Sequence, residues 1–221
     1  ADTVITISEN TKKDILKLIK ISPEKIQTIY LGVDAHLTTQ KERGQKKILE
    51  KYSITRPYIL FVGMLEPRKN INGLIRAYAQ VKEKDSHHLV LVGKKGWKYE
   101  DIFMTVKELG LQNMVHFLGY VPDEDLPSLY SAATCFVYPS FYEGFGIPVL
   151  EAMACGCPVI TSNNSSMKEI AENAAILIDP ENKEAIADAI GLVISNKKAQ
   201  QRMRKAGLLQ DPLQRQGSPC P

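Results

Sequence analysis

The sequence predicts an α/β fold built on a Rossmann-like parallel sheet with helices on both faces. Short apolar runs recur at regular intervals from Tyr58 onward, and helical patterns separate most of them. Strands that are apolar on both sides are typical of a parallel sheet buried between two helical layers. The expected strands cover residues 58–62, 89–92, 114–118, 134–138, 158–161 and 175–178.

Helical patterns fill the segments between these runs and continue beyond the last one. They cover residues 71–84, 99–109, 123–132, 148–154 and 166–172, followed by two closing helices at 183–194 and 198–208. In such a sheet, ligands bind beyond the carboxyl ends of the strands. The loops that leave the strands are therefore the segments to search for a site.

The two ends of the chain have a different character. Residues 3–7 and 26–30 suit strands, and residues 8–10 offer caps for a helix over 11–19. Ala1 is not an initiator Met and leads almost directly into a strand pattern, so we expect a piece of a longer protein.

These patterns divide the chain into four parts. Residues 1–34 are expected to form a separate lobe, and the polar, Lys-rich segment 35–56, with a helix near 46–52, is interpreted as a linker. The regular α/β pattern occupies residues 57–209. Residues 210–221 lack periodicity and are expected to be a disordered or non-native tail.

The composition excludes several classes of protein. The chain has 221 residues, of which 44% are hydrophobic and 24% charged, as in ordinary globular proteins. A net charge of +3 is too weak to indicate a nucleic-acid partner. There is no apolar run of the length needed to cross a bilayer, although this leaves a peripheral membrane contact open.

Neither cysteines nor histidines indicate a metal site. The cysteines, Cys135, Cys155, Cys157 and Cys220, lack the paired spacing of zinc ligands, and no histidine has a partner at metal-ligand spacing. Cys155 and Cys157 lie next to an expected buried strand, and we interpret these two as packing thiols in a reducing cytoplasm, with a redox role as the lesser alternative.

One stretch, FYEGFGIPVLEAM, carries most of the functional signal. It contains Glu143, Glu151, a Gly-Phe-Gly turn at residues 144–146, and Pro148, which suits the first turn of a helix. A helix starting near Ile147 would direct its unpaired N–H groups toward an anion, and the glycines would let a phosphate or a sugar hydroxyl approach the backbone. The carboxylates would then flank an elongated ligand. The alternative is a turn that only lets a strand and a helix pack closely.

Three other loops at the same sheet edge contain glycine. GMLEPRKN begins at Gly63 and places Arg68 and Lys69 directly before a helix, where adjacent cations suit a diphosphate, unless they are ordinary solvated charges. In GKKGWKY, Trp97 could stack on a base or sugar, but packing against the following helix is favoured. In LGYVP, the backbone near Tyr120 could contact a purine edge or form only a tight turn.

These segments together resemble a known family. GMLEPRKN, LGYVPDEDLPSLYSAA and FYEGFGIPVLEAMACGCPVI are similar to motifs of the retaining glycosyltransferases of family 4, which have the GT-B fold. The motifs occur in order between about Tyr58 and Leu208, and residues 8–34 resemble the end of the N-terminal lobe and the crossover. The resemblance implies a two-lobe enzyme that transfers a sugar from a nucleotide diphosphate sugar. This chain would supply the C-terminal, donor-binding lobe and lack most of the acceptor lobe.

The resemblance also implies roles for the residues at the sugar and the diphosphate. Glu143, with the backbone of Gly144, Phe145 and Gly146, resembles the group that holds the donor sugar. Arg68 and Lys69 resemble the cations that neutralise the leaving diphosphate, so that no metal and no cofactor are required. One departure is Met64, which follows Gly63 where many members of the family have Arg.

The nucleoside part has its own expected contacts. Glu151 resembles the residue that accepts hydrogen bonds from the ribose, and Gly119, Tyr120 and Val121 resemble the segment that contacts the base. The resulting hypothesis is transfer of a sugar from GDP-mannose, with UDP-glucose as the alternative donor, to a glycan or lipid-linked acceptor bound by the other lobe. The expected location is the cytoplasm, with the inner face of the membrane as an option.

Two readings compete with this one. The isolated chain could be a nucleotide-binding module without activity of its own. A Rossmann-type dinucleotide enzyme is disfavoured because no G-x-G-x-x-G follows the first expected strand and no acidic residue ends the second in the required register.

Overall fold

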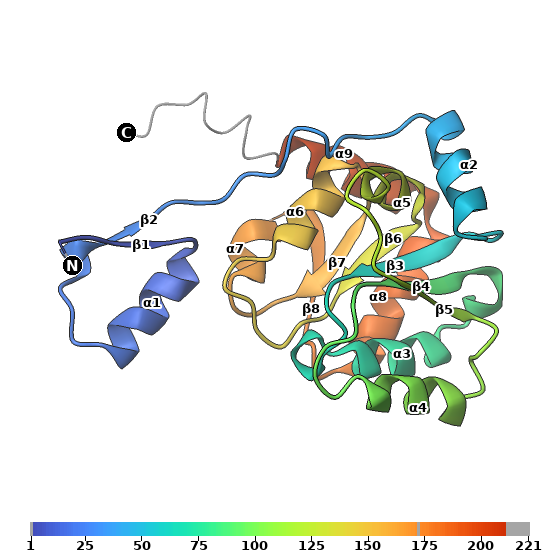
Figure 1. Ribbon diagram of the computed structural model, residues 1–221, viewed down its shortest axis with the longest axis horizontal. Coiled ribbons are helices and arrows are strands. Elements are labelled where there is room, and N and C mark those ends of the chain that lie inside the picture. The colour runs from blue at the N-terminus through green and yellow to red at the C-terminus, as the bar shows by residue number, and fades with distance from the viewer. Residues whose placement is uncertain (1, 172, 211–221) are drawn as a thin grey trace.

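The computed structural model describes residues 2–171 and 173–210. A large α/β body and a smaller N-terminal unit make up this part of the chain (Figure 1). None of the helices within these described ranges is long and apolar enough to cross a membrane.

The large body is organised around a six-stranded sheet with the order β5-β4-β3-β6-β7-β8, in which all paired strands are parallel. The strands are β3 (Tyr58–Val62), β4 (His88–Val92), β5 (Val115–Gly119), β6 (Cys135–Tyr138), β7 (Val159–Ser162) and β8 (Ala175–Ile178). The predicted fold class is confirmed, and two of the expected strands, 58–62 and 175–178, have the observed bounds.

Helices cover both faces of this sheet. They are α2 (Glu42–Lys51), α3 (Ile71–Gln80), α4 (Glu100–Glu108), α5 (Leu126–Ala132), α6 (Ile147–Ala154), α7 (Met167–Ala171), α8 (Lys183–Ser195) and α9 (Lys197–Leu209). On one face α3 packs against α4 and α8, whereas α5 and α6 lie on the other face with α2 and α9 (Figure 1).

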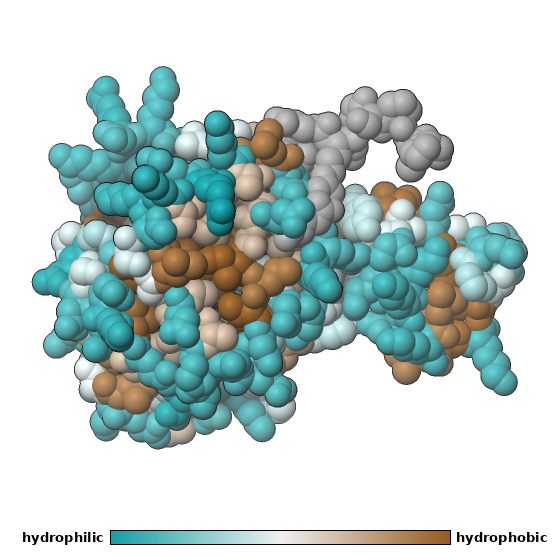
Figure 2. Space-filling view, turned by 180° about the vertical axis from the view of Figure 1, so that it is seen from behind, coloured by the Kyte–Doolittle hydropathy of each residue, from teal (hydrophilic) through white to brown (hydrophobic). Residues whose placement is uncertain are grey.

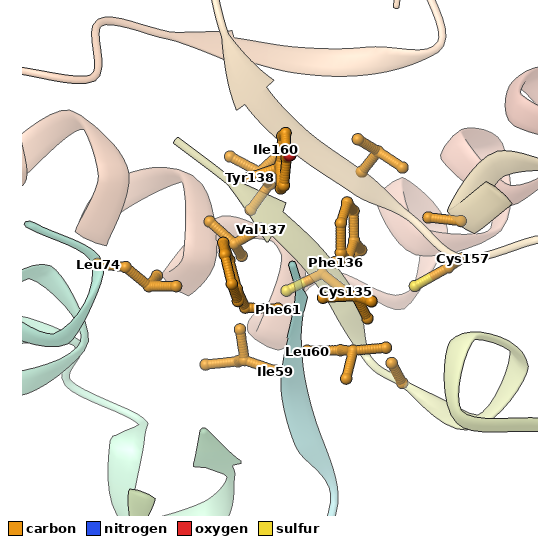
Figure 3. Close-up of a cluster of buried hydrophobic side chains, with 14 of the residues drawn as sticks. Ile59, Leu60, Phe61, Leu74, Cys135, Phe136, Val137, Tyr138, Cys157 and Ile160 are labelled. Atoms are coloured by element: carbon orange, nitrogen blue, oxygen red, sulfur yellow. The ribbon is translucent and has the colours of Figure 1, made fainter. Parts of the chain in front are cut away.

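The centre of the body is the pair of strands β3 and β6. Ile59, Leu60 and Phe61 of β3 are fully buried, as are Phe136 and Val137 of β6. Leu74 of α3 approaches from one side of the strands and Cys157 lies on the other (Figure 3). Burial of each large apolar side chain contributes about 1.5–3 kcal/mol, so the two loops that leave β3 and β6 start from a fully buried part of the sheet.

The smaller unit contains β1 (Val4–Thr6), α1 (Glu9–Leu18), the 3-10 turn η1 (Pro23–Lys25) and β2 (Ile26–Thr28). β1 and β2 pair in parallel. The Ser8 side chain caps α1 by accepting a hydrogen bond from the N–H of Thr11, as the sequence predicts. Several apolar side chains of this unit are exposed, including Leu18 and Ile19, and hydrophobic residues are visible on its surface in Figure 2.

A helix lies inside the segment expected to be a linker. α2 runs from Glu42 to Lys51, starting earlier than the expected helix near 46–52, and packs against α5. Lys51 Nζ and Tyr52 Oη lie 2.5 and 2.6 Å from Asp125 Oδ2. Val33 and Leu37, which precede α2 in the chain, are buried in the core of the large body.

Some expected helix ends are wrong, for local reasons. The helix expected over 71–84 ends at Gln80, because Val81 is extended and a separate 3-10 turn follows. The helix expected from residue 123 begins at Leu126, because residues 123–125 form a turn in which the Asp125 N–H donates to the Pro122 carbonyl.

Cys155 and Cys157 confirm the expectation of packing thiols, and Cys135 is packed in the same way. Cys135, Cys155 and Cys157 are free and buried, and burial raises the pKa of Cys135 and Cys155 to about 12. Cys220 and the tail from residue 211 lie outside the described residues.

Candidate functional site

The strand order reverses between β3 and β6, and open α/β sheets have their ligand crevice at such a point. The chain leaves β3 toward β4 on one side and later returns to β6 on the other. The loops after β3 and β6 are tied together, since the N–H of Phe141 donates to the Arg68 carbonyl at 3.0 Å. Two of the sequence-predicted loops therefore meet at this crevice.

A cluster of three charged side chains lies where these loops meet. Lys69 Nζ is 2.6 Å from Glu143 Oε1, and Arg68 Nη1 is 2.9 Å from Glu143 Oε2. Ser140 Oγ donates to Glu143 Oε1 at 2.7 Å, and Lys69 Nζ also lies 2.5 Å from Tyr138 Oη. The sequence predicts all three charged residues as site residues, and the structure brings them into direct contact.

The electrostatics of the cluster favour an ionised Glu143. Burial alone raises the pKa of this carboxyl, but hydrogen bonds from Lys69 and Ser140, together with the charge of Lys69, lower it overall. Arg68 also pairs with Glu66, at 2.7 Å, so the two cations face two carboxylates. The Arg68 guanidinium is 46% exposed and can still donate hydrogen bonds to a diphosphate.

Local backbone structure positions Lys69. Residues Pro67–Lys69 form the 3-10 turn η2, with Pro at its start, and Asn70 then adopts a left-handed conformation with φ of 53° before α3 begins. The Asn70 side chain fixes this bend by donating to the Pro180 carbonyl at 2.6 Å. The turn directs Lys69 inward, and its side chain is only 10% exposed.

The loop before α6 presents backbone N–H groups. Gly146 caps α6 with φ of 107°, and a side chain at this position would collide with Met167. Among the described residues, none accepts a hydrogen bond from the N–H groups of Gly144, Phe145 or Gly146. Consecutive N–H groups without partners can hold an anion or the oxygen atoms of a sugar.

Glu151 lies on α6 and has a partner of its own. Tyr130 Oη donates to Glu151 Oε2 at 2.8 Å. Burial raises the pKa of Glu151, although the Tyr130 hydrogen bond works in the opposite direction. The two glutamates of the motif are thus held by different groups, Glu143 by cations and Glu151 by a neutral phenol.

The remaining predicted loops line the same sheet edge. Gly63 and Gly93 approach each other closely, and a side chain on Gly93 would collide with the Gly63 carbonyl oxygen. After β5, Val121 is buried, whereas Tyr120 is exposed and has Lys94 Nζ 4.8 Å from its ring centroid. The Gly119 carbonyl accepts a hydrogen bond from the N–H of Gly93, which ties this loop to the loop after β4.

The expectation that Trp97 packs against the following helix is wrong. Its side chain is 70% exposed, and Lys98 Nζ lies 4.6 Å from the ring centroid. Lys98 adopts a left-handed conformation, with φ of 52°, which fixes the loop at this point.

Sequence reasoning missed the neutral side chains that hold the charged ones. Tyr138 and Ser140 contact Glu143, Tyr130 contacts Glu151, and Ser166 contacts the carbonyls of the loop before α6. Tyr138 is the last residue of β6 and Ser140 follows that strand. Their position at the carboxyl end of a strand is therefore a signal that could have identified them. Tyr130 lies on a helix and gives none.

The fold is shared with solved glycosyltransferase structures. A structure of HepE from Anabaena in complex with UDP and glucose has a TM-score of 0.87 at 24% identity, over 95% of this chain and 58% of that one. A sucrose-phosphate synthase from Thermosynechococcus elongatus has a TM-score of 0.84 at 29% identity, over 96% of this chain and 54% of that one. The described body is therefore the C-terminal, Rossmann-like half of a GT-B fold.

The sequence comparison is more specific. Residues 44–210 match the family described as glycosyl transferases group 1, and the chain belongs to this family. O-antigen chain mannosyltransferase B of Escherichia coli is 38% identical, over 85% of this chain and 50% of that protein. O-antigen chain mannosyltransferase RfbU of Salmonella typhimurium is 34% identical, over 85% and 49%. The chain spans about half the length of these relatives.

Proposed function

We propose that this chain is the donor-binding lobe of a retaining mannosyltransferase that uses GDP-mannose. The observation that carries the proposal is the cluster of Arg68, Lys69 and Glu143 beside the N–H groups of the loop before α6, which have no acceptor within residues 2–171 and 173–210. Cations, a carboxylate and free N–H groups within one crevice suit a diphosphate joined to a sugar. The names of the relatives, which are mannosyltransferases, favour mannose.

In the proposed reaction, the bond from the sugar C1 to the diphosphate oxygen breaks and a bond from C1 to the acceptor oxygen forms. The acceptor attacks from the face that the diphosphate leaves, which retains the configuration, and its proton passes to the departing diphosphate. Negative charge grows on that group, so Arg68 and Lys69 stabilise the transition state more than the ground state. These cations supply the countercharge that a metal ion would otherwise supply.

The other residues of the crevice bind and orient the donor. Glu143 accepts hydrogen bonds from the sugar hydroxyls, and the N–H groups of residues 144–146 donate to oxygen atoms of the sugar. Glu151 accepts hydrogen bonds from the ribose. Residues 119–121 contact the base through their backbone groups. Because backbone contacts leave little trace of the base in the sequence, UDP-glucose is the alternative donor.

The acceptor belongs to the parent protein rather than to this lobe. We propose a glycan or lipid-linked acceptor, bound by an N-terminal lobe, with the enzyme in the cytoplasm and the inner face of the membrane as an optional location. The isolated chain would then bind the donor without transferring its sugar. Release of mannose from GDP-mannose by residues 1–221 alone would contradict this inactivity.

A ligand panel tests the donor. We would measure the melting temperature of the purified chain with GDP, UDP, ADP and their sugar conjugates, in the presence of EDTA. A ligand at 100 times its dissociation constant stabilises the native state by about 2.7 kcal/mol, which is easily detected. GDP and GDP-mannose should raise the melting temperature most. No shift with any nucleotide at millimolar concentration would overturn the proposal.

The phosphate role of Lys69 has a separate test. Lys69→Ala should weaken GDP and UDP to a similar extent, because it removes a contact with the group that they share. Lys98→Ala, which alters an exposed lysine over the Trp97 ring, is the matched control and should leave both affinities unchanged. Unchanged diphosphate affinity in Lys69→Ala would transfer the role to Arg68.

A further inference from the structure

The smaller N-terminal unit touches the proposed sugar-binding loop at its second residue. Ser8 Oγ lies 2.7 Å from the carbonyl oxygen of Gly144, and Thr11 Oγ1 lies 3.1 Å from the same oxygen. Ser8 is fully buried at this contact. In Figure 1 the N-terminal end of α1 lies beside the loop that precedes α6.

The neighbouring carbonyls of the loop are also occupied by hydroxyl groups. Ser166 Oγ lies 2.8 Å from the carbonyl oxygen of Glu143 and 2.7 Å from that of Phe145. Side-chain hydroxyl groups therefore hold three consecutive carbonyls, those of Glu143, Gly144 and Phe145. Two of them are held from within the large body, and the middle one is held by α1 and its cap.

The geometry of the peptide bond links these carbonyls to the free N–H groups. In a planar trans peptide, the C=O of one residue and the N–H of the next point in opposite directions. Holding the Gly144 carbonyl therefore turns the Phe145 N–H away from α1. This N–H is one of the three that have no acceptor among the described residues.

Two further contacts fix α1 against the large body. The N–H groups of Glu9 and Asn10, at the start of α1, donate to the Glu169 carboxylate at 3.2 and 3.4 Å. A carboxylate is stabilised at this end of a helix by the unpaired N–H groups and the helix dipole. Tyr142 Oη donates to Asp14 Oδ2 at 2.6 Å, one turn further along α1.

We propose that Ser8 and Thr11 are positioning residues for the donor sugar. By holding the Gly144 carbonyl, they orient the Phe145 N–H toward the sugar, although they belong to a segment outside residues 44–210 that match the family. The inference rests on the proposed function, because it assigns the loop to the sugar. It adds that the sugar-binding loop has its binding conformation only while Ser8 and Thr11 contact the Gly144 carbonyl.

The contact predicts a selective effect on binding. In the proposed function the N–H groups of residues 144–146 donate to the sugar, so a nucleotide diphosphate without a sugar uses only the cations and the ribose site, whereas a nucleotide sugar uses the loop as well. Loss of the two hydroxyl groups should therefore weaken the nucleotide sugar alone. A purely structural role would weaken both ligands together.

Calorimetric titration of the whole chain with GDP-mannose and with GDP measures this difference. In the double variant Ser8→Ala, Thr11→Val we expect GDP-mannose to bind about tenfold more weakly, as for the loss of a buried hydrogen bond, and GDP to bind as before. Ser22→Ala is the matched control, because Ser22 precedes η1 and makes no side-chain capping bond. If the ligand panel favours uridine, UDP-glucose and UDP take their place.

An unchanged ratio of the two dissociation constants in the double variant would overturn the inference. Glu169→Gln provides a second route if the double variant does not fold, since it weakens the seat of α1 without touching the loop backbone. It should also reduce GDP-mannose affinity selectively, and equal losses for the two ligands would again overturn the inference. Failure of the unmodified chain to bind any nucleotide diphosphate would instead overturn the proposed function.

Discussion

Lys69 Nζ and Glu143 Oε1 lie 2.6 Å apart, although the two residues are 74 positions apart in the chain and come from loops after different strands. Both side chains are only 10% exposed. Removing Glu143 would leave the Lys69 ammonium away from water without a countercharge, whereas removing Lys69 would leave Glu143 paired with Arg68. The pair that is proposed to bind the donor therefore also contributes to the stability of the lobe.

The stability of the lobe should respond differently to the two cations of the cluster. Lys69→Met should lower the free energy of unfolding by about 3 kcal/mol, the low end of the range for a broken buried pair, because Arg68 still faces Glu143. Arg68→Ala should cost only about 0–1 kcal/mol, because the Arg68 side chain is 46% exposed. Urea unfolding of the two variants measures both values. Equal losses would show that burial does not distinguish these cations.

The pKa of Glu143 predicts an acid-sensitive contribution to stability. The carboxyl has an ordinary value of 4.5 and a lower value in the folded chain, so the folded state favours its ionised form. The stabilisation is complete above pH 4.5 and is lost as the pH falls through the lower folded-state pKa. Glu143→Gln should therefore flatten the dependence of melting temperature on pH below 4.5. An unchanged slope would rule out Glu143 as its source.

Tyr130→Phe should reduce the affinity for ribonucleotides by removing the donor that orients Glu151. We expect about a fivefold to tenfold loss for GDP and a smaller loss for 2′,3′-dideoxy-GDP, which lacks the ribose hydroxyls. Tyr58→Phe is the control, because Tyr58 is equally buried and donates to the Leu129 carbonyl at 2.6 Å. Tyr58→Phe should lower stability without changing affinity. Parallel affinity losses in the two variants would argue against the role of Tyr130.

Gly93→Ala should destabilise the lobe more than Gly110→Ala. Both glycines have positive φ, 145° and 66°, but only Gly93 faces another backbone, the Gly63 carbonyl. Alanine at Gly110 has open space and should cost only the left-handed conformation, about 1–2 kcal/mol. Chemical unfolding of the two variants checks the order, and equal losses would show that the Gly63 loop moves aside freely.

The strands were predictable because their sequences need no distant information. Tyr58–Val62 and Ala175–Ile178 are apolar on both faces, which a parallel sheet requires and few other structures tolerate. Helix ends were less predictable. Residues 81–84 continue the helical pattern, yet Val81 adopts an extended conformation, because tertiary packing overrides a weak local preference there.

The candidate site was predictable as a set of residues but not as an arrangement. Glycine and charge at strand ends identified Lys69 and Glu143, whereas their pairing depends on β3 and β6 being neighbours, which is a property of the strand order. The Ser8 hydroxyl was identified only as a helix cap. Its second contact, with Gly144, joins residues 136 positions apart and leaves no periodic signal in the sequence.

The burial of Val33 and Leu37 sets the length of the tether between the two units. β2 ends at Thr28, Leu31 packs against the core of the large body and Val33 is buried in it, so the connection between the two units is only a few residues long. A connection this short keeps the two surfaces at an effective concentration on the order of millimolar. If α1 leaves Gly144, it therefore rebinds as an intramolecular event, and opening of the proposed donor site is a local, reversible excursion rather than a separation of two domains.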